Sequence, residues 1–478
     1  MERMRKIPID AINSKKWEAG AARLYNTTIK TEDVAPQSER ELLYRKLAFL
    51  GKDGSAKKVL NEYIMEGKSP KKRDLIDCAK ELRKYNQHRQ ALEILEWLDR
   101  RKIQFSRLDH ALRIDLTAKT MGITVAKNYL ENLALPLRNS MTYGCLLNSY
   151  CKELMVEEAL LLFEKMDELC LLKSSIPFNN LMTMYLRLNQ PEKMIKLVEE
   201  MRTRNIFPDR FTYNMRMQCY SCLGDIEKVE KVFDEMLNDE NVRCDWTSFS
   251  NLAAIYTKFG LLEKAATTLT TLEAEMCPKN REAYHFLICM YATLLNSEEV
   301  HRLWNSLKSN FRKITNHTYC VLFSAFSRLH DLESLRKCFA EWESSCSYYD
   351  AKVANLVIKA YLDHDKYEEG MSVFENASSR CEGKLFTARQ MLCAFALKCN
   401  NIDLAMEHFR SGFSECQSAG LEWKPKHNIV DAFFRHFREE EDADGAEQFC
   451  ELLRLANLMD SGASRSLQSV YEAAGRHT

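Results

Sequence analysis

A repeat with a period of about 35 residues dominates the middle of this 478-residue chain. Seven successive units start at or near Ser140, with one extra residue inserted before the fourth. Six units carry an aromatic residue at the fourth place, namely Tyr143, Phe178, Tyr213, Phe249, Tyr284 and Tyr319. All seven carry another aromatic residue seven positions later, namely Tyr150, Tyr185, Tyr220, Tyr256, Tyr291, Phe326 and Tyr361. Seven residues are two helical turns, so both rings lie on one face of a first helix.

A second helix follows in each unit. Its apolar residues are spaced four and three apart, as in Ala159, Phe163 and Met166. Turn residues such as Gly224 separate the two helices, and pairs such as Pro208-Asp209 end the unit. Each unit is therefore predicted to be a helical hairpin, which buries its apolar face only by stacking on its neighbours. The sequence has only 9 Pro and 15 Gly, which also favours helices with short connections, so the predicted fold class is all-α.

Weaker units extend the pattern in both directions and suggest the domain organisation. We expect an N-terminal arm or residual transit segment over 1–38, followed by a helical hairpin over 39–71. Degenerate basic repeats are expected over 72–139 and the repeat core over 140–385. Degenerate repeats and a closing helix are expected over 386–478, because terminal units face solvent or a partner.

The net charge of zero hides an asymmetry along the chain. Residues 1–139 have 29 Lys and Arg against 19 Asp and Glu, a balance of +10 that leaves −10 for the remainder. Nine cations are clustered in this part of the sequence: Lys71, Lys72, Arg73, Lys80, Arg83, Lys84, Arg100, Arg101 and Lys102. Such clusters neutralise RNA phosphates without reading sequence, and a solvated helix surface is the alternative interpretation.

No motif in the sequence indicates a catalytic residue, a cofactor or a metal site. The Cys219-x-x-Cys222 pair lies within a first helix, and no second Cys or His pair follows at zinc-site spacing. A zinc-deaminase signature and a phosphate-binding glycine loop are both missing from the sequence. We therefore expect no enzyme and no small-molecule substrate. No run of 18 apolar residues occurs, so no membrane-spanning helix is expected, and the 17 cysteines are expected to be reduced.

The unit openings and closings resemble the pentatricopeptide repeat. Thr212-Tyr213-Asn214 opens a unit in that style, and Met201 followed by Pro208-Asp209 closes one. The tetratricopeptide repeat, with a similar period, requires an early Trp and a Leu-Gly pair that these units lack. The resemblance implies a right-handed superhelical solenoid of helix-turn-helix repeats. The flanking sequences, such as Tyr63-Ile64-Met65-Glu66-Gly67, resemble plant organellar members that have plain repeats and no catalytic tail.

In this family one repeat faces one RNA base, which is contacted by the fifth residue and the last residue of the unit. The resemblance extends to three consecutive pairs: Asn179 with Asp209, Asn214 with Asp245, and Ser250 with Asn280. The other units, such as the one with His285 and Thr315, depart from the pattern. The alternative interpretation of these polar residues is that they cap helices and form turns.

The resemblance also implies a cellular role. Several close relatives of this group are constituents of the plant mitochondrial ribosome, in the small subunit. The leading hypothesis is therefore a structural protein of the mitochondrial matrix that contacts ribosomal RNA and ribosomal proteins. A free RNA-binding factor for transcript processing, stability or translation is the second hypothesis, and a pure protein scaffold is the third.

Overall fold

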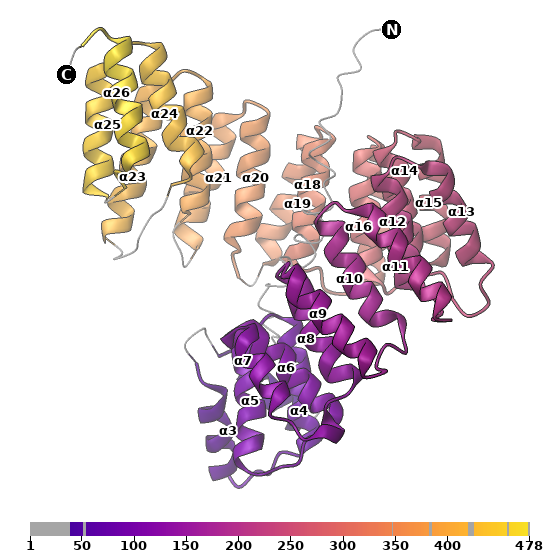
Figure 1. Ribbon diagram of the computed structural model, residues 1–478. Helices are drawn as coiled ribbons and strands as arrows, with labels where there is room; N and C mark the ends of the chain where they lie inside the picture. The colour runs from indigo at the N-terminus through magenta and orange to yellow at the C-terminus, as the bar shows by residue number, and fades with distance from the viewer. Residues whose placement is uncertain are drawn as a thin grey trace. The chain divides into compact units, whose positions relative to one another are not determined.

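The computed structural model describes residues 39–50, 54–346, 348–381, 385–418, 425–456 and 458–476. Within these ranges the chain consists of helices joined by short turns, without a β-strand (Figure 1). The expected arm over 1–38 lies outside the described residues. None of the described helices has the length and apolar character needed to cross a bilayer.

The chain divides into two compact units, one ending at Met276 and the other beginning at Cys277. The helices of the first unit are α2 (Glu39–Ala48), α3 (Ala56–Met65), α4 (Lys72–Lys84), α5 (His88–Arg100), α6 (Arg107–Met121), α7 (Ile123–Glu131), the 3-10 helix η2 (Leu135–Leu137), α8 (Ser140–Lys152), α9 (Val156–Glu168), α10 (Ser175–Arg187), α11 (Pro191–Thr203), α12 (Arg210–Cys222), α13 (Ile226–Leu237), α14 (Trp246–Lys258) and α15 (Leu262–Glu275).

The second unit continues the same alternation of first and second helices. Its helices are α16 (Arg281–Thr293), α17 (Ser297–Asn310), α18 (Asn316–Arg328), α19 (Leu332–Ser345), α20 (Ala351–Asp363), α21 (Tyr367–Arg380), α22 (Phe386–Lys398), α23 (Ile402–Ser418), α24 (His427–Glu439), α25 (Ala443–Leu455) and α26 (Ser461–Ala473).

Within each compact unit the hairpins stack in chain order. Each first helix packs on its own second helix and on the next first helix, as α10 packs on α11 and α12 in the first unit. The second unit repeats this arrangement from α16 to α26. The chain is therefore an all-α repeat solenoid, and the predicted fold class is confirmed.

Local sequence sets the helix ends. Asp209 caps α12 because its carboxylate accepts the Thr212 backbone N–H at 2.8 Å, and Asn139 caps α8 in the same way. Gly224 and Gly260 follow α12 and α14 with φ of 77° and 73°, a conformation in which glycine has no Cβ penalty. The turn signals of the repeat therefore act as caps and C-terminal stops.

The aromatic places of the repeat form the core. Rings from the fourth place, such as Tyr143, Phe178 and Tyr319, are buried, and Phe178 packs edge-to-face on Phe163 of the preceding second helix. The second-helix stripe Ala159, Phe163 and Met166 is buried as well. Burial of these rings is the main driving force for stacking one hairpin on the next.

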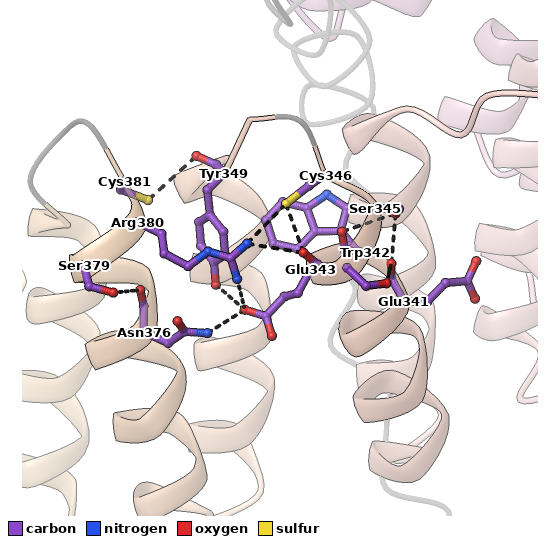
Figure 2. Close-up of polar contacts among 11 residues, drawn as sticks. Glu341, Trp342, Glu343, Ser345, Cys346, Tyr349, Asn376, Ser379, Arg380 and Cys381 are labelled. Atoms are coloured by element: carbon purple, nitrogen blue, oxygen red, sulfur yellow. Dashed lines mark hydrogen bonds and ion pairs between the residues drawn. The ribbon is translucent and has the colours of Figure 1, made fainter.

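Polar contacts join consecutive second helices at their C-terminal ends. In the second unit, Glu343 of α19 accepts hydrogen bonds from Tyr349 at 2.7 Å and from Asn376 of α21 at 2.8 Å. Arg380 of α21 lies 3.5 Å from the same carboxylate and stacks on the Tyr349 ring (Figure 2). The joint between α19 and α21 is therefore a charge-assisted network above a buried Trp342.

Candidate nucleic-acid interface

The first predicted base-reading pair is engaged within the protein. Asn179 donates from Nδ2 to both carboxylate oxygens of Asp209, at 3.1 and 3.2 Å. Its Oδ1 accepts the Thr212 hydroxyl at 2.9 Å, and Ser175 donates to Asp209 at 2.7 Å. Asn179 is only 6% exposed. The pair is therefore a joint between two repeats, and a base would have to displace these bonds in order to be read.

The same network determines the charge state of Asp209. Burial by itself raises the pKa of this carboxyl, but hydrogen bonds from Thr212, Ser175 and Asn179 outweigh the burial. The pKa of Asp209 is consequently lowered, and the group is ionised near neutral pH. It is a fixed negative charge at the N-terminus of α12, where the helix dipole also favours an anion.

The second predicted pair is not joined in this way. Asp245 caps α14 through the Thr247 backbone N–H at 2.9 Å and pairs with Arg210 at 2.5 Å. The Oδ1 atom of Asn214 is buried and has no hydrogen-bond partner among the described residues. A buried acceptor of this kind can be satisfied by a donor from a ligand, so Asn214 is the more available of the two asparagines.

The members of the third predicted pair belong to different compact units, and the structure describes each separately. Ser250 donates its hydroxyl to the Thr247 carbonyl of its own helix at 2.8 Å. Asn280 caps α16 by accepting the Ala283 backbone N–H at 3.2 Å. Asn280 thus has the capping role that the sequence left open, whereas Ser250 bonds a backbone carbonyl within its own helix.

A histidine takes the fifth place in the first repeat of the second unit. The His285 imidazole makes a 2.9 Å hydrogen bond to Thr318, just as Asn179 bonds Thr212 in the first unit. Burial, with smaller contributions from His317 and Arg281, lowers the pKa of His285 to about 3. The fifth place therefore forms the same inter-repeat joint with a different side chain.

The nine predicted cations do not form one patch. The helices α4 and α5 form a hairpin, and Lys72 reaches across its open end to the Gln104 carbonyl at 2.7 Å. Lys71, Arg73, Arg100, Arg101 and Lys102 share that end, whereas Lys80, Arg83 and Lys84 lie towards the turn of the hairpin. Along α4 the two groups are separated by a rise of about 10 Å between Arg73 and Lys80, and of about 18 Å between Lys72 and Lys84.

Several of these cations are already neutralised. Lys72 pairs with Asp109 at 2.7 Å, Lys84 with Glu81 at 2.7 Å and Arg83 with Asp115 at 3.4 Å. In the same region, Lys80 lies 3.3 Å from Asp77 and Arg101 stacks 4.0 Å over the Trp97 ring. The remaining four, Lys71, Arg73, Arg100 and Lys102, are exposed and make no ion pair within the described part of the chain. These four are free to meet phosphate.

The structure reveals a further set of cations, of which the sequence prediction had named only Lys84. The last turns of many first helices end in a basic residue at equivalent positions. In the first unit these are Lys84, Lys119, Lys152, Arg187 and Lys258, and in the second unit Arg328 and Lys398. We call this set the cationic stripe. The spacing of 33 to 35 residues between neighbours, or about twice that where one repeat lacks a cation, could have revealed it from sequence.

Members of the cationic stripe reach back to the preceding repeat. Arg187 donates to the Lys152 carbonyl, and Lys258 donates to the Ser221 carbonyl at 3.2 Å. Burial and then the charge of Lys119 lower the pKa of Lys152. Cations at helix C-termini stabilise the helix dipole, so the stripe has a structural role besides any role in binding. Consecutive positive charges at one helix end also form a track that suits a polyanion.

Exposed apolar side chains accompany the polar fifth places. Met141, Ile176 and Phe211 are the second residues of α8, α10 and α12, and they are 49%, 59% and 48% exposed. In the second unit the equivalent residues are charged or polar, as in Glu282, His317 and Lys352. Apolar side chains on an open surface can pack against the faces of nucleotide bases.

The cysteine pair of α12 shows no sign of metal chemistry. Cys219 is buried, and burial raises the pKa of its thiol to about 11, while Cys222 is exposed. In the described ranges, no group of three or more His, Cys, Asp or Glu side chains could hold a metal ion. Cys219 is therefore a protonated core thiol.

The repeat geometry can be compared with that of known protein families. The structure is a stack of helical hairpins in which the fifth place of each first helix recurs and a cationic stripe follows the ends of the first helices. These features define a helical-repeat protein. The PPR repeat family profile matches residues 173–222, and PPR repeat profiles match 137–167, 211–240 and 353–380.

Two relatives match nearly the whole chain. The chain is 42% identical to "Pentatricopeptide repeat-containing protein At1g02370, mitochondrial" of Arabidopsis thaliana, over 91% of this chain and 82% of the relative. It is 41% identical to the Arabidopsis thaliana "Large ribosomal subunit protein mL101", over 94% and 92%. The chain therefore belongs to the pentatricopeptide repeat family, and it is a repeat protein and not an enzyme.

A solved structure has the same type of repeat. The crystal structure of the pentatricopeptide repeat protein PPR10 from maize matches with 15% identity and a TM-score of 0.45. The match covers 91% of this chain and 66% of that protein, so this chain spans just under two thirds of its length.

Proposed function

We propose that this protein is an RNA-binding constituent of the plant mitochondrial ribosome, located in the mitochondrial matrix. It contacts ribosomal RNA through its first compact unit and neighbouring ribosomal proteins through other surfaces. It acts by holding RNA and proteins in place and performs no chemistry.

The cationic stripe is the observation that carries the RNA-binding part. Five of its seven members lie in the first unit, the unit that also contains the unpaired Lys71, Arg73, Arg100 and Lys102. Of the five, Lys84 and Lys119 are paired with Glu81 and Asp115, which leaves Lys152, Arg187 and Lys258 for phosphate. Each cation that meets a phosphate releases a counterion, and this release favours binding of any RNA strand that fits the stripe. The exposed Met141, Ile176 and Phe211 can stack on its bases.

The fifth-place residues argue for a fixed RNA partner over selection of one transcript. Asn179 and Asp209 are bonded to each other, and Asp245 is bonded to Arg210, so base reading would require breaking internal contacts. Contacts to phosphate and RNA shape need no such change. A structural RNA with a defined shape is the kind of ligand that this surface suits.

The ribosomal part rests on relatedness. One relative that matches nearly the whole chain is named as a large-subunit ribosomal protein. The sequence resemblance implied the small subunit, whereas this relative favours the large subunit, and we propose the large subunit. Relatives named as mitochondrial support the location in mitochondria.

Sedimentation of a gently prepared mitochondrial lysate tests the proposal. The lysate is run on sucrose gradients at low and at high salt with magnesium held constant, and fractions are probed for this protein and for markers of each subunit. A constituent of the large subunit travels with that subunit at both salts, because many buried contacts resist screening.

The other outcomes separate the alternatives. Co-sedimentation with the small subunit keeps the ribosomal role but overturns the large-subunit assignment. A protein in light fractions, or one that leaves the ribosome as salt rises, contradicts the ribosomal proposal. Crosslinking to a messenger or precursor RNA would then favour a free transcript factor, and the lack of any RNA crosslink would favour a protein scaffold.

A further inference from the structure

Two histidines from consecutive repeats of the second compact unit meet at the turns between first and second helices. The Nδ1 atom of His330 lies 2.7 Å from the Nε2 atom of His364, and the ring centroids are 4.8 Å apart at an interplanar angle of 74°. His330 follows α18 and His364 follows α20, two first helices that pack side by side. No sequence motif indicates this pair, because 34 residues separate its members.

The hydrogen bonds of His364 fix which of its ring nitrogens carries a hydrogen. Its Nδ1 atom lies 2.7 Å from the Ala360 carbonyl oxygen, which can only accept, so Nδ1 carries the hydrogen and donates it. The Nε2 atom of the neutral ring therefore has a free lone pair, and this lone pair is directed at His330. In the hydrogen-bonded form of the pair, His330 donates from Nδ1 to that lone pair.

The other tautomer of His330 converts the hydrogen bond into a pair of metal ligands. When the hydrogen is on Nε2, the Nδ1 atom also presents a lone pair, and the two lone pairs converge on one point. The side chain of His330 is exposed, so water can accept the hydrogen bond from Nε2. Two converging neutral imidazoles are nitrogen ligands of the kind that Zn²⁺ prefers.

Both rings are held by contacts within their own part of the repeat stack. The carbonyl of Ala360 orients His364, and histidine ligands of metal ions commonly donate their second N–H to such a carbonyl. His330 directly precedes Asp331, which caps α19 and lies 3.1 Å from His301 of α17. The two nitrogens are thus brought together before any ion binds, which lowers the entropy cost of binding.

We propose that His330 and His364 form a binding site for a divalent transition-metal ion of the zinc type, which joins two consecutive repeats. The inference is independent of the proposed RNA-binding function. Zn–N bonds of about 2.0–2.1 Å at a tetrahedral angle place two ligand nitrogens about 3.3 Å apart. The observed 2.7 Å must widen by about 0.6 Å, which a small rotation of an exposed ring supplies. In the described ranges no group of three or more His, Cys, Asp or Glu is assembled for a metal, so water completes the coordination.

The surroundings favour an ion that binds nitrogen over one that binds oxygen. Mg²⁺ and Ca²⁺ take oxygen ligands, and an imidazole offers none. The two carboxylates that flank His364 in the sequence are already paired, Asp363 with Lys359 at 2.9 Å and Asp365 with Lys398 at 3.0 Å. A borderline transition-metal ion is therefore the ligand that this pair suits.

The test uses the full chain, the double variant H330N/H364Q and the matched control H427Q/H436Q. Asparagine replaces His330 because the φ of 57° at this position is left-handed, a conformation that asparagine tolerates. The control removes two histidines of α24 in the same compact unit, which are separated by a helical rise of about 13 Å and cannot share one ion. All the proteins keep the same 17 cysteines, so any binding of metal to thiols is common to them.

Zn²⁺ alone is titrated in competition with a chelating indicator, and the Cε1–H signals of ¹³C-labelled histidines are followed by NMR. The unmodified protein should bind one Zn²⁺ that H330N/H364Q does not bind, and Zn²⁺ should shift two histidine signals that the double variant lacks. H330N and H364Q should each weaken this binding about tenfold or more, because even partners outside the metal ligands are worth about that much. Mg²⁺ should leave both signals in place.

Several results would overturn the assignment. Equal binding of Zn²⁺ by the unmodified protein and H330N/H364Q does so, and so does an equal loss in H427Q/H436Q. Histidine signals that do not move with Zn²⁺ would show that the pair is a hydrogen bond only. Circular dichroism checks the helix content of each variant, and the two single variants decide the question by the same comparison if the double variant fails to fold.

Discussion

The two compact units are built on the same hairpin but place different chemistry on their first helices. In the first unit, α8, α10 and α14 end in Lys152, Arg187 and Lys258, whereas in the second unit α20 and α24 end in Asp363 and Glu439. Both units bury the same aromatic places, such as Phe178 and Phe326. The comparison teaches that a few buried positions fix the fold, while exposed positions of the same repeat are free to set the partner.

The contacts that we propose therefore differ in kind between the units. The first unit offers a stripe that follows successive repeats, together with apolar side chains for base stacking. In the second unit the stripe is reduced to Arg328 and Lys398, and the proposed metal site of His330 and His364 joins two of its repeats. A long RNA segment suits the stripe of the first unit, and a single metal ion suits the histidine pair of the second.

Core truncation gives the largest expected effect and shows whether the units behave separately. Phe178→Ala and Phe326→Ala each remove a fully buried ring, which costs about 3–5 kcal/mol in the free energy of unfolding. Each variant should lose hydrogen-exchange protection mainly in its own compact unit, because repeat proteins are stabilised by nearest neighbours. Exchange measured by mass spectrometry checks this.

The control for the core variants is Phe207→Ala, at a site that is 79% exposed, where the change should stay within about 0.5 kcal/mol. Equal loss of protection across both units in either core variant would contradict the division into two separately stabilised stacks.

Exchanging the fifth-place residues should change acid sensitivity in the second unit and not in the first. The folded pKa of His285, about 3, lies below its unfolded value near 6.5, so the unfolded state takes up the proton first as pH falls. Stability is then lost between about pH 6.5 and pH 3. His285→Asn should make this loss shallower, because asparagine does not titrate. Asn179→His should introduce no comparable loss in the first unit, because the ionised Asp209 beside it favours the charged imidazolium.

Urea unfolding at a series of pH values measures this effect. Asp209 contributes in a lower window, because its lowered pKa gives stability above about pH 4 that is lost as pH falls through the folded pKa. Asp209→Asn should reduce the acid loss in that window alone. Identical pH profiles for His285→Asn and the unmodified protein would show that the histidine is not buried in neutral form.

The smallest expected effect separates the two parts of the cationic stripe. K152Q/K258Q should weaken binding of single-stranded RNA several-fold and make the salt dependence shallower by about 1. R328Q/K398Q removes the same charge from the second unit and should have less effect, because Lys398 is already paired with Asp365 at 3.0 Å. Fluorescence anisotropy at several salt concentrations measures both, and a larger loss in R328Q/K398Q would reverse the proposed division.

The fold was predictable because it depends on a periodic pattern of buried residues. The spacing of Tyr143, Tyr150 and Phe163 specifies two helical faces, and the turn residues mark where each helix ends. The candidate interface was less predictable, because the sequence gives the identity of a polar side chain but not its hydrogen-bond or ion-pair partner. Nothing in the sequence shows that the Asn179 amide donates its hydrogen bonds to Asp209, or that Lys72 forms an ion pair with Asp109.

The histidine pair illustrates the same limit. His330 and His364 are 34 residues apart in the sequence and meet only because α18 and α20 pack side by side. The cationic stripe, in contrast, was open to detection, since its members recur at the repeat spacing. The sequence prediction concentrated on residues 71–102 and so missed the period of the charges.

Crosslinking of this protein to RNA within intact mitochondrial ribosomes is the most direct test. Ribosomes are irradiated, the RNA is digested, and the protein peptides that carry nucleotides are identified by mass spectrometry. The account predicts nucleotide-bearing peptides from the first helices of the first unit, around Lys152, Arg187 and Lys258. Crosslinks confined to second helices, or a protein that sediments with ribosomes but carries no crosslinked nucleotide, would contradict it.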